Sequence, residues 1–177
     1  MKKVIGFTML LLILTNFSSN AETTVFRSDK DKFRFSYPSD WLVKQGNGAN
    51  VKAKVTSNKD GVSCNVVVRK VPNFTNSDYI SNFSIQEMFQ DFKERFTDAK
   101  LLNGGLGFID NTKAHVIIVD YSYSALNKSV KLRSIIAQTA RKEKAYNLTC
   151  ASHRSLFTKY ELVFADILTS FVFEDWQ

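Results

Sequence analysis

The chain has the length, composition and charge of one small globular domain. Its 177 residues are 44% hydrophobic and 23% charged, and they include 7 glycines and only 2 prolines. These values exclude a disordered, collagen-like or low-complexity chain. The formal net charge of +7 is spread over short clusters, so no basic tail indicates nucleic-acid binding.

The first 21 residues are typical of a secretory signal peptide. Lys2-Lys3 is a basic start, residues 4–14 are an apolar run, and residues 19–21 form a small-x-small cleavage site. The apolar run has eleven residues, whereas a membrane-spanning helix needs about 20. We therefore favour cleavage between Ala21 and Glu22 over a membrane anchor.

Cleavage leaves residues 22–177, which we interpret as a single domain. The loss of Lys2 and Lys3 lowers the formal net charge from +7 to +5. A chain of this size buries roughly 68 to 70% of its unfolded surface, which is enough for one self-sufficient core. The sequence thus predicts a periplasmic or secreted protein with one domain and no transmembrane anchor after cleavage.

An aromatic strand is predicted near the start of the mature chain. Phe33, Phe35 and Tyr37 alternate with polar residues, which is the pattern of a half-buried strand. Pro38 ends the strand because it has no N–H to donate. A turn then follows, and Trp41 is expected to re-enter the core.

Two strands, a loop and a capped helix follow in chain order. Strands are predicted at 51–57 and 63–71, with an Asp-Gly turn between them. The polar stretch 73–82 is interpreted as a long surface loop. Ser84 and Glu87 form a capping box for a helix that extends to about Asp98. Its apolar residues fall on one stripe that is expected to pack in the core: Ile85, Met88, Phe89, Phe92 and Phe96.

The second half of the chain predicts a meander and a final helix. Strands near 100–110, 114–123, 130–141 and 144–151 are joined by short turns, so they pair antiparallel. An amphipathic helix over about 156–169 is expected to lie on the sheet. The fold class is therefore α+β, an antiparallel β-sheet meander packed with two main amphipathic helices.

Two short motifs at the ends of the mature chain resemble those of a known superfamily. One is F-x-F-x-Y-P-x-x-W over 33–41, and the other is I-x-x-S-F-x-F over 167–173. Both are similar to motifs of the PsbP-like superfamily, which includes PsbP and DcrB-like exported proteins. The resemblance implies an α/β/α layered domain that acts mainly through protein partners. The residue directly after Ala21 is Glu22 and not a cysteine, so the chain departs from the lipoprotein members of that group.

The mature chain contains two cysteines, Cys64 and Cys150. Both lie on apolar faces of predicted strands, and export would place them in a compartment where disulfides persist. A disulfide and two buried free thiols both remain open, because the sequence does not give the distance between the two Cα atoms.

Four basic residues lie on the last two predicted strands of the meander: Lys131, Arg133, Arg141 and Lys144. They suggest a basic face for anionic lipid headgroups or an acidic protein partner. An ordinary solvated sheet surface explains the same pattern.

Few residues suit catalysis or metal binding. His115 is interpreted as a packed or edge residue of a strand, and His153 as a residue that caps or flanks the last helix. The sequence has no H-x-x-x-H, C-x-x-C or H-E-x-x-H motif. The glycines of 103–107 lack phosphate-loop spacing and predict a bulge or tight turn, and the carboxylate pairs 29/31 and 174/175 are expected to face solvent. We predict no catalytic, cofactor-binding or metal-binding residues.

The sequence thus favours an exported, non-catalytic binding or assembly protein that acts through a protein partner. The alternative is a periplasmic carrier of a lipid or other small hydrophobic ligand, with a pocket between the sheet and the helices. An enzyme would require His115 or His153 beside a carboxylate in an open cleft.

Overall fold

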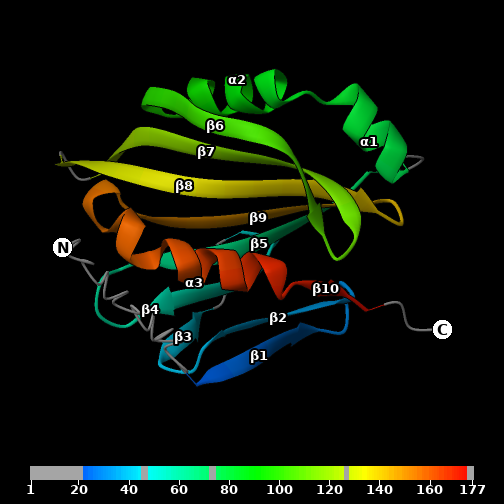
Figure 1. The fold of residues 1–177 in the computed structure, drawn as a ribbon, viewed down its shortest axis with the longest axis horizontal. Coiled ribbons are helices and arrows are strands. Elements are labelled where there is room, and N and C mark those ends of the chain that lie inside the picture. Colours follow the sequence, from blue (N-terminus) through cyan, green and yellow to red (C-terminus); the bar gives the residue numbers. More distant parts are fainter. Residues whose placement is uncertain (1–21, 45–47, 72–74, 126–127, 175–177) are drawn as a thin grey trace, which may run out of the picture.

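The computed structural model describes residues 22–44, 48–71, 75–125 and 128–174, and these contain two antiparallel sheets (Figure 1). The small sheet consists of β1 (Thr23–Ser28), β2 (Phe33–Pro38) and β10 (Val172–Phe173), in the order β1-β2-β10. The large sheet consists of β3 (Trp41–Lys44), β4 (Val51–Ser57), β5 (Ser63–Lys70), β6 (Thr97–Ile109), β7 (Thr112–Ala125), β8 (Lys128–Arg141) and β9 (Lys144–His153). Its order is β3-β4-β5-β9-β8-β7-β6. The predicted meander is therefore confirmed as β6 to β9.

The helices cover both faces of the large sheet. They are α1 (Asn76–Asn82), α2 (Ile85–Arg95) and α3 (Phe157–Thr169), and a short 3-10 helix, η1 (Arg154–Leu156), precedes α3. Figure 1 shows α1 and α2 on one side of the sheet, and α3 with the small sheet on the other. The predicted α+β layering is confirmed. None of the helices in the described part of the chain has the length and apolar character needed to span a membrane.

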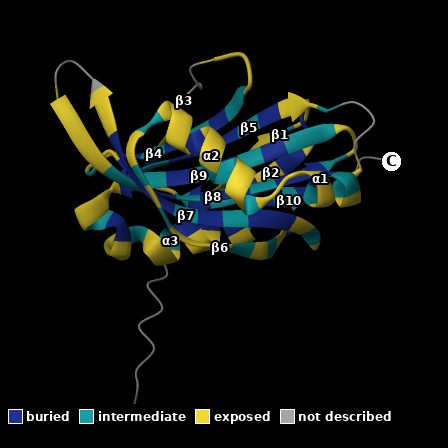
Figure 2. Ribbon diagram, turned by 90° about the horizontal axis from the view of Figure 1, so that it is seen from above, coloured by how far each residue is buried: buried dark blue, intermediate teal, exposed yellow. Residues whose placement is uncertain are grey.

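The opening aromatic strand lies in the core. Phe33, Phe35, Tyr37 and Trp41 are all buried. The Phe33 ring is stacked on Phe171, with 5.2 Å between the ring centroids. The alternating pattern thus predicted the buried face of β2 correctly. In Figure 2, buried residues follow the inner strands, while exposed residues gather on the helices and strand ends.

The stretch 73–82, interpreted as a loop, contains helix α1, and this expectation was wrong for the described residues 75–82. Thr75 and Asp78 form a capping box that starts the helix. Its Tyr79 is buried against the sheet, where its hydroxyl donates to Gln138 Oε1 at 3.3 Å. Residues 73 and 74 lie outside the described residues.

The capping box predicted for α2 is confirmed, but the helix ends earlier than expected. Ser84 accepts from the backbone N–H of Glu87, and the Glu87 side chain accepts from the N–H of Ser84. Phe96 is already extended, and β6 begins at Thr97 rather than after Asp98. The apolar stripe of α2 packs on the sheet around the buried Phe92.

The proposed signal peptide, residues 1–21, lies outside the described residues. Glu22, the residue after the proposed cleavage site, is exposed, and its carbonyl oxygen accepts from Ser39 N–H at 2.8 Å. The cleavage itself remains a prediction.

Candidate functional site

The four predicted basic residues lie on one face of the large sheet, but at opposite ends of it. Lys131 and Arg133 are near the start of β8, whereas Arg141 ends that strand and pairs with Lys144 of β9. Arg133 and Arg141 are eight residues apart in an extended strand, or about 26 Å. The residues of β8 between them on this face, including the buried Ala137, are part of the hydrophobic core. The structure thus divides the expected basic face into two sites.

The first site is a surface pocket of about 270 Å³ at the β8–β9 turn. We call it the basic pocket. Its lining residues are Lys32, Arg141, Lys142, Lys144, Tyr146, Phe173 and Glu174. Four of these are cationic and one is a carboxylate. The basic pocket therefore gathers positive charge from two parts of the chain that are distant in sequence, Lys32 and residues 141–144.

Two left-handed turns position the charges of this pocket. Lys142 and Glu143 have φ values of 47° and 59°, as the two central residues of a tight hairpin require. Lys32 also has a positive φ, 59°, and its N–H donates to the carbonyl of Ser28 at 2.7 Å. The turns bring lysines before β2 and after β8 to the same end of the molecule.

Two aromatic residues, Tyr146 and Phe173, line the basic pocket. The guanidinium carbon of Arg141 is 4.9 Å from the centroid of the Phe173 ring, which is a cation–π arrangement. Tyr146 meets Phe173 edge to face, with 4.9 Å between the centroids. The Tyr146 hydroxyl donates to the carbonyl of Asp31 at 3.0 Å. Arg141 is thus held on a packed surface.

Carboxylates pair with cations both in the basic pocket and beside it. Lys144 Nζ lies 3.6 Å from Asp31 Oδ1, and Glu174 Oε1 lies 2.6 Å from Arg27 and 3.3 Å from Arg34. The expectation that Asp31 and Glu174 face solvent was wrong, because distant strands bring cations to both. The hydrogen bond from Arg27 is the main reason that the pKa of Glu174 is lowered. Asp29 is exposed, and residue 175 lies outside the described residues.

The second site is an ion-pair cluster at the start of β8. Arg133 donates to both carboxylate oxygens of Asp120, at 2.6 and 2.9 Å, and Arg154 lies 3.7 Å from the same carboxylate. Arg133 also lies over the Phe157 ring. A smaller pocket of about 170 Å³ adjoins this cluster, and Lys131 is part of its lining. Arg133 therefore links the sheet to α3, and we do not assign it to a partner surface.

The free energy of unfolding is expected to fall in acid, because protonation of Asp120 removes its ion pair with Arg133. The hydrogen bond from Arg133, with the charges of Arg133, Arg154 and Lys100, lowers the pKa of Asp120 from its ordinary value of 3.8. The ionised carboxylate thus stabilises the fold above that ordinary value, and the contribution is lost as the pH falls through the lowered pKa. Denaturant unfolding of wild type and Asp120→Asn between pH 7 and pH 2 should show a difference that shrinks in acid.

Asp91→Asn is the matched control, because it removes an exposed carboxylate on α2. Its unfolding free energy should follow that of the wild type over the same range. A constant difference between Asp120→Asn and wild type down to pH 2 would contradict the role given to the ion pair.

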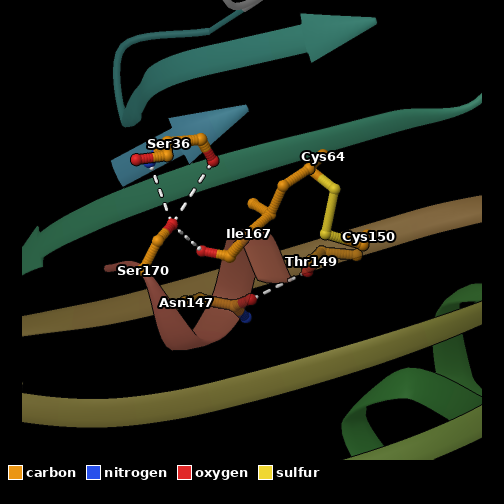
Figure 3. The surroundings of a disulfide bond; sticks show 7 residues. All are labelled: Ser36, Cys64, Asn147, Thr149, Cys150, Ile167 and Ser170. Atoms are coloured by element: carbon orange, nitrogen blue, oxygen red, sulfur yellow. Dashed lines mark hydrogen bonds between the residues drawn. A yellow bond between two sulfur atoms is a disulfide. The ribbon is translucent and has the colours of Figure 1, made fainter. Parts of the chain in front are cut away.

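The two cysteines face each other at the centre of the large sheet (Figure 3). Cys64 of β5 is directly opposite Cys150 of β9, and both are buried. Their Sγ atoms are 2.04 Å apart, in a disulfide. Ile167 of α3 lies close to the disulfide in Figure 3, and the hydroxyl of Ser170 donates to the carbonyl oxygens of Ile167 and Ser36. Of the two alternatives left open by the sequence, the structure contains the disulfide.

Both histidines have structural positions. His115 is buried, and its Nε2 lies 3.3 Å from the carbonyl oxygen of Ile80. His153 accepts from the N–H of Ser155 and caps η1. Within the described ranges, no group of three or more His, Cys, Asp or Glu side chains is placed to hold a metal ion.

The comparisons with known proteins agree with this fold. A family model described as PsbP matches residues 21–173. The chain belongs to the PsbP family. The resemblance inferred from the two end motifs is thus confirmed, since the match includes both of them.

Several solved structures are similar to this PsbP-family chain. Cyanobacterial PsbP (CyanoP) from Synechocystis sp. PCC 6803 has a TM-score of 0.59 and 16% identity, over 86% of this chain and 93% of that one. The Saccharomyces cerevisiae Ran-binding protein Mog1p has a TM-score of 0.58 and 8% identity, over 88% and 97%. LpqN of Mycobacterium tuberculosis has a TM-score of 0.56 and 8% identity, over 90% and 88%. No curated protein matches the sequence. At these identities the likeness shows the fold alone.

Of the seven residues that line the basic pocket, sequence reasoning assigned only Arg141 and Lys144 to a basic face. Lys32, Phe173 and Glu174 join it through the pairing of β2 with β10, which are more than 130 residues apart in the chain. Lys142 was within reach, because a two-residue link between strands predicts a tight hairpin that places it beside Arg141 and Lys144.

Proposed function

We propose that this PsbP-family chain is an exported, non-catalytic binding or accessory protein, and that its basic pocket contacts an acidic surface of a protein partner. The observation that carries the proposal is the excess of cations: the four that line the pocket outnumber the lining carboxylate Glu174 together with Asp31 and Asp110, which pair with Lys144 and Arg141. Complementary charge steers partners together and selects among them. Arg141, held against Phe173, supplies an ordered cation for such an interface.

Export and a binding role have independent support. The N-terminal 21 residues resemble a signal peptide, and a buried disulfide suits an oxidising compartment such as the periplasm or the cell exterior. Mog1p, one of the similar structures, is described as a Ran-binding protein, and LpqN as involved in cell envelope biogenesis. A binding role is therefore consistent with the description of Mog1p, a protein of similar fold.

The alternative function is the carriage of a lipid or other small hydrophobic ligand. Both pockets described above are lined by several charged side chains, which do not suit an acyl chain. An anionic headgroup would still compete for the basic pocket. Native mass spectrometry separates the two functions, since a stoichiometric lipid would support the carrier.

Site-specific crosslinking in the native host tests whether the basic pocket contacts a protein partner. A photoreactive amino acid replaces Lys142 at the pocket, and in a control it replaces Lys93, an exposed residue of α2 on the opposite face of the sheet. The full-length chain is expressed, and its processed N-terminus is read by mass spectrometry, with Glu22 expected first. A specific protein crosslinked from position 142 but not from position 93 supports the proposal.

Charge reversal at the same two positions measures how much the basic pocket contributes to the affinity for the captured partner. Lys142→Glu should weaken binding of the captured partner by about tenfold or more, and Lys93→Glu, with the same change in net charge, should leave it near the wild-type value. Equal binding by both variants would exclude the basic pocket as the contact. Replicate experiments that capture no specific protein would overturn the proposed partner.

A further inference from the structure

Strand β6 forms an exposed edge of the large sheet. Among the described strands, β7 is its sole hydrogen-bonded neighbour, and Figure 1 shows it as the outermost strand on the side of α2. Edge strands are usually protected from further pairing by shortness, charge or proline. β3, at the other edge, has only four residues. β6 has 13 residues, and 101–109 carry neither a charge nor a proline.

Exposed apolar side chains accompany this edge. Leu106 and Phe108 are 64% and 69% exposed, and both lie on the face of the sheet that carries α1 and α2. Helix α2 begins above Gly104, where an added Cβ would be 2.9 Å from Ile85 Cγ2, and it continues toward the Thr97 end of β6. Helix α1 packs on β7 and β8 instead. Neither helix covers Leu106 or Phe108.

We propose that β6 pairs antiparallel with β6 of a second copy of this chain, about a two-fold axis at Leu106. The regular ladder with β7 extends from Asn103 to Ile109, between a register shift after Leu101 and the turn at 110–111, so Leu106 is its centre. This interface continues the large sheet from one copy into the next. It is independent of the basic pocket.

The sequence of β6 is complementary to itself in this register. Leu106 lies beside Leu106 of the second copy, and Phe108 lies opposite Gly104, since these positions are symmetric about 106. Gly104 has no side chain to collide with the ring, and Ile85 beside it offers apolar surface. Gly105 lies opposite Gly107. A large residue thus meets a glycine, and no charge repels its own copy, which favours a second copy over an unrelated strand.

The oligomeric state tests the proposal. The full-length chain, exported and processed by its host, should form a dimer by sedimentation equilibrium as concentration rises. Leu106→Glu places two carboxylates side by side at the axis and should weaken the dimer by about tenfold or more. Leu162→Glu is the control, since Leu162 is 78% exposed on α3 and should leave the dimer intact. A wild type that stays monomeric, or equal dimerisation by both variants, would overturn the proposal.

Cysteine crosslinking tests the register. The described cysteines are joined in the disulfide, so an introduced thiol has no free thiol partner among them within its own chain. Leu106→Cys should form a disulfide-linked dimer under mild oxidation, because the two copies of this position are adjacent. Phe108→Cys should not, because its two copies are about four residues apart along the paired strands. Crosslinking through position 108 instead of 106 would overturn the proposed axis.

Discussion

Replacing Cys64 and Cys150 together by alanine is expected to lower the free energy of unfolding by about 4 to 5 kcal/mol. The bond joins residues that are 86 positions apart, so its loss frees a long loop in the unfolded chain. In the chain-entropy model, a 15-residue loop contributes about 3 kcal/mol and a 100-residue loop about 4.7 kcal/mol. Small domains have only about 5 to 15 kcal/mol in total, so urea unfolding should show a marked shift in the midpoint.

Chemical labelling provides the control for this prediction. Wild-type protein denatured without a reductant should take up no alkylating reagent, and reduction should expose two thiols. Reduced wild type should lose about as much stability as the double alanine variant, because both remove the same constraint. Two labelled thiols before reduction, or unchanged unfolding in the variant, would contradict the disulfide.

The parts of the fold that depend on residues close together in the sequence were predictable. Ser84 and Glu87 are three positions apart, and their capping box starts α2 as expected. The alternation of aromatic and polar residues in β2 predicted which of its faces is buried, since side-chain direction in a strand has a period of two. The short links between the later strands predicted that they pair antiparallel, because parallel pairing needs a long crossover. These features need no knowledge of the rest of the chain.

Helix α1 could not be predicted in the same way, because tertiary contacts hold it. Its residues are mostly polar and have weak helix preference. The side-chain amide of Asn76 donates to the carbonyl oxygens of Lys113 and Ala140 and to Thr139 Oγ1, at 3.0 to 3.2 Å. These partners lie on β7 and β8, so the helix depends on a sheet that forms from later residues.

The candidate site was only partly predicted, because it too depends on contacts between residues that are distant in the sequence. The sequence placed Arg133 and Arg141 on one predicted strand, 130–141, but it does not show which elements cover each part of that strand. The pairing of β10 with β2 brings Glu174 to Arg27 and Arg34, and no local pattern indicates that contact. Hence the sequence suggested one basic face, where the structure has a pocket at one end and an ion-pair cluster at the other.

Phe33→Ala is expected to lower the free energy of unfolding by about 3 to 5 kcal/mol. Phe33 is fully buried, and its ring lies between the small and large sheets. It is stacked at 5.2 Å on Phe171 and meets Tyr146 of β9 edge to face at 6.3 Å. The substitution would leave a cavity between three elements, β2, β9 and the segment after α3. Urea unfolding measures the loss.

Leu162→Ala is the matched control, because Leu162 is 78% exposed and its truncation should change stability by less than about 0.5 kcal/mol. A double-mutant cycle of Phe33→Ala with Phe171→Ala then isolates the ring contact, with a coupling of about 0.5 to 1.5 kcal/mol expected. If Phe33→Ala were no more costly than the control, the small sheet would not be coupled to the rest of the core. A large cost with a measurable coupling would mean that the aromatic motif at 33–41 joins the two sheets into one cooperative unit, which in turn holds β10 and the basic pocket in place.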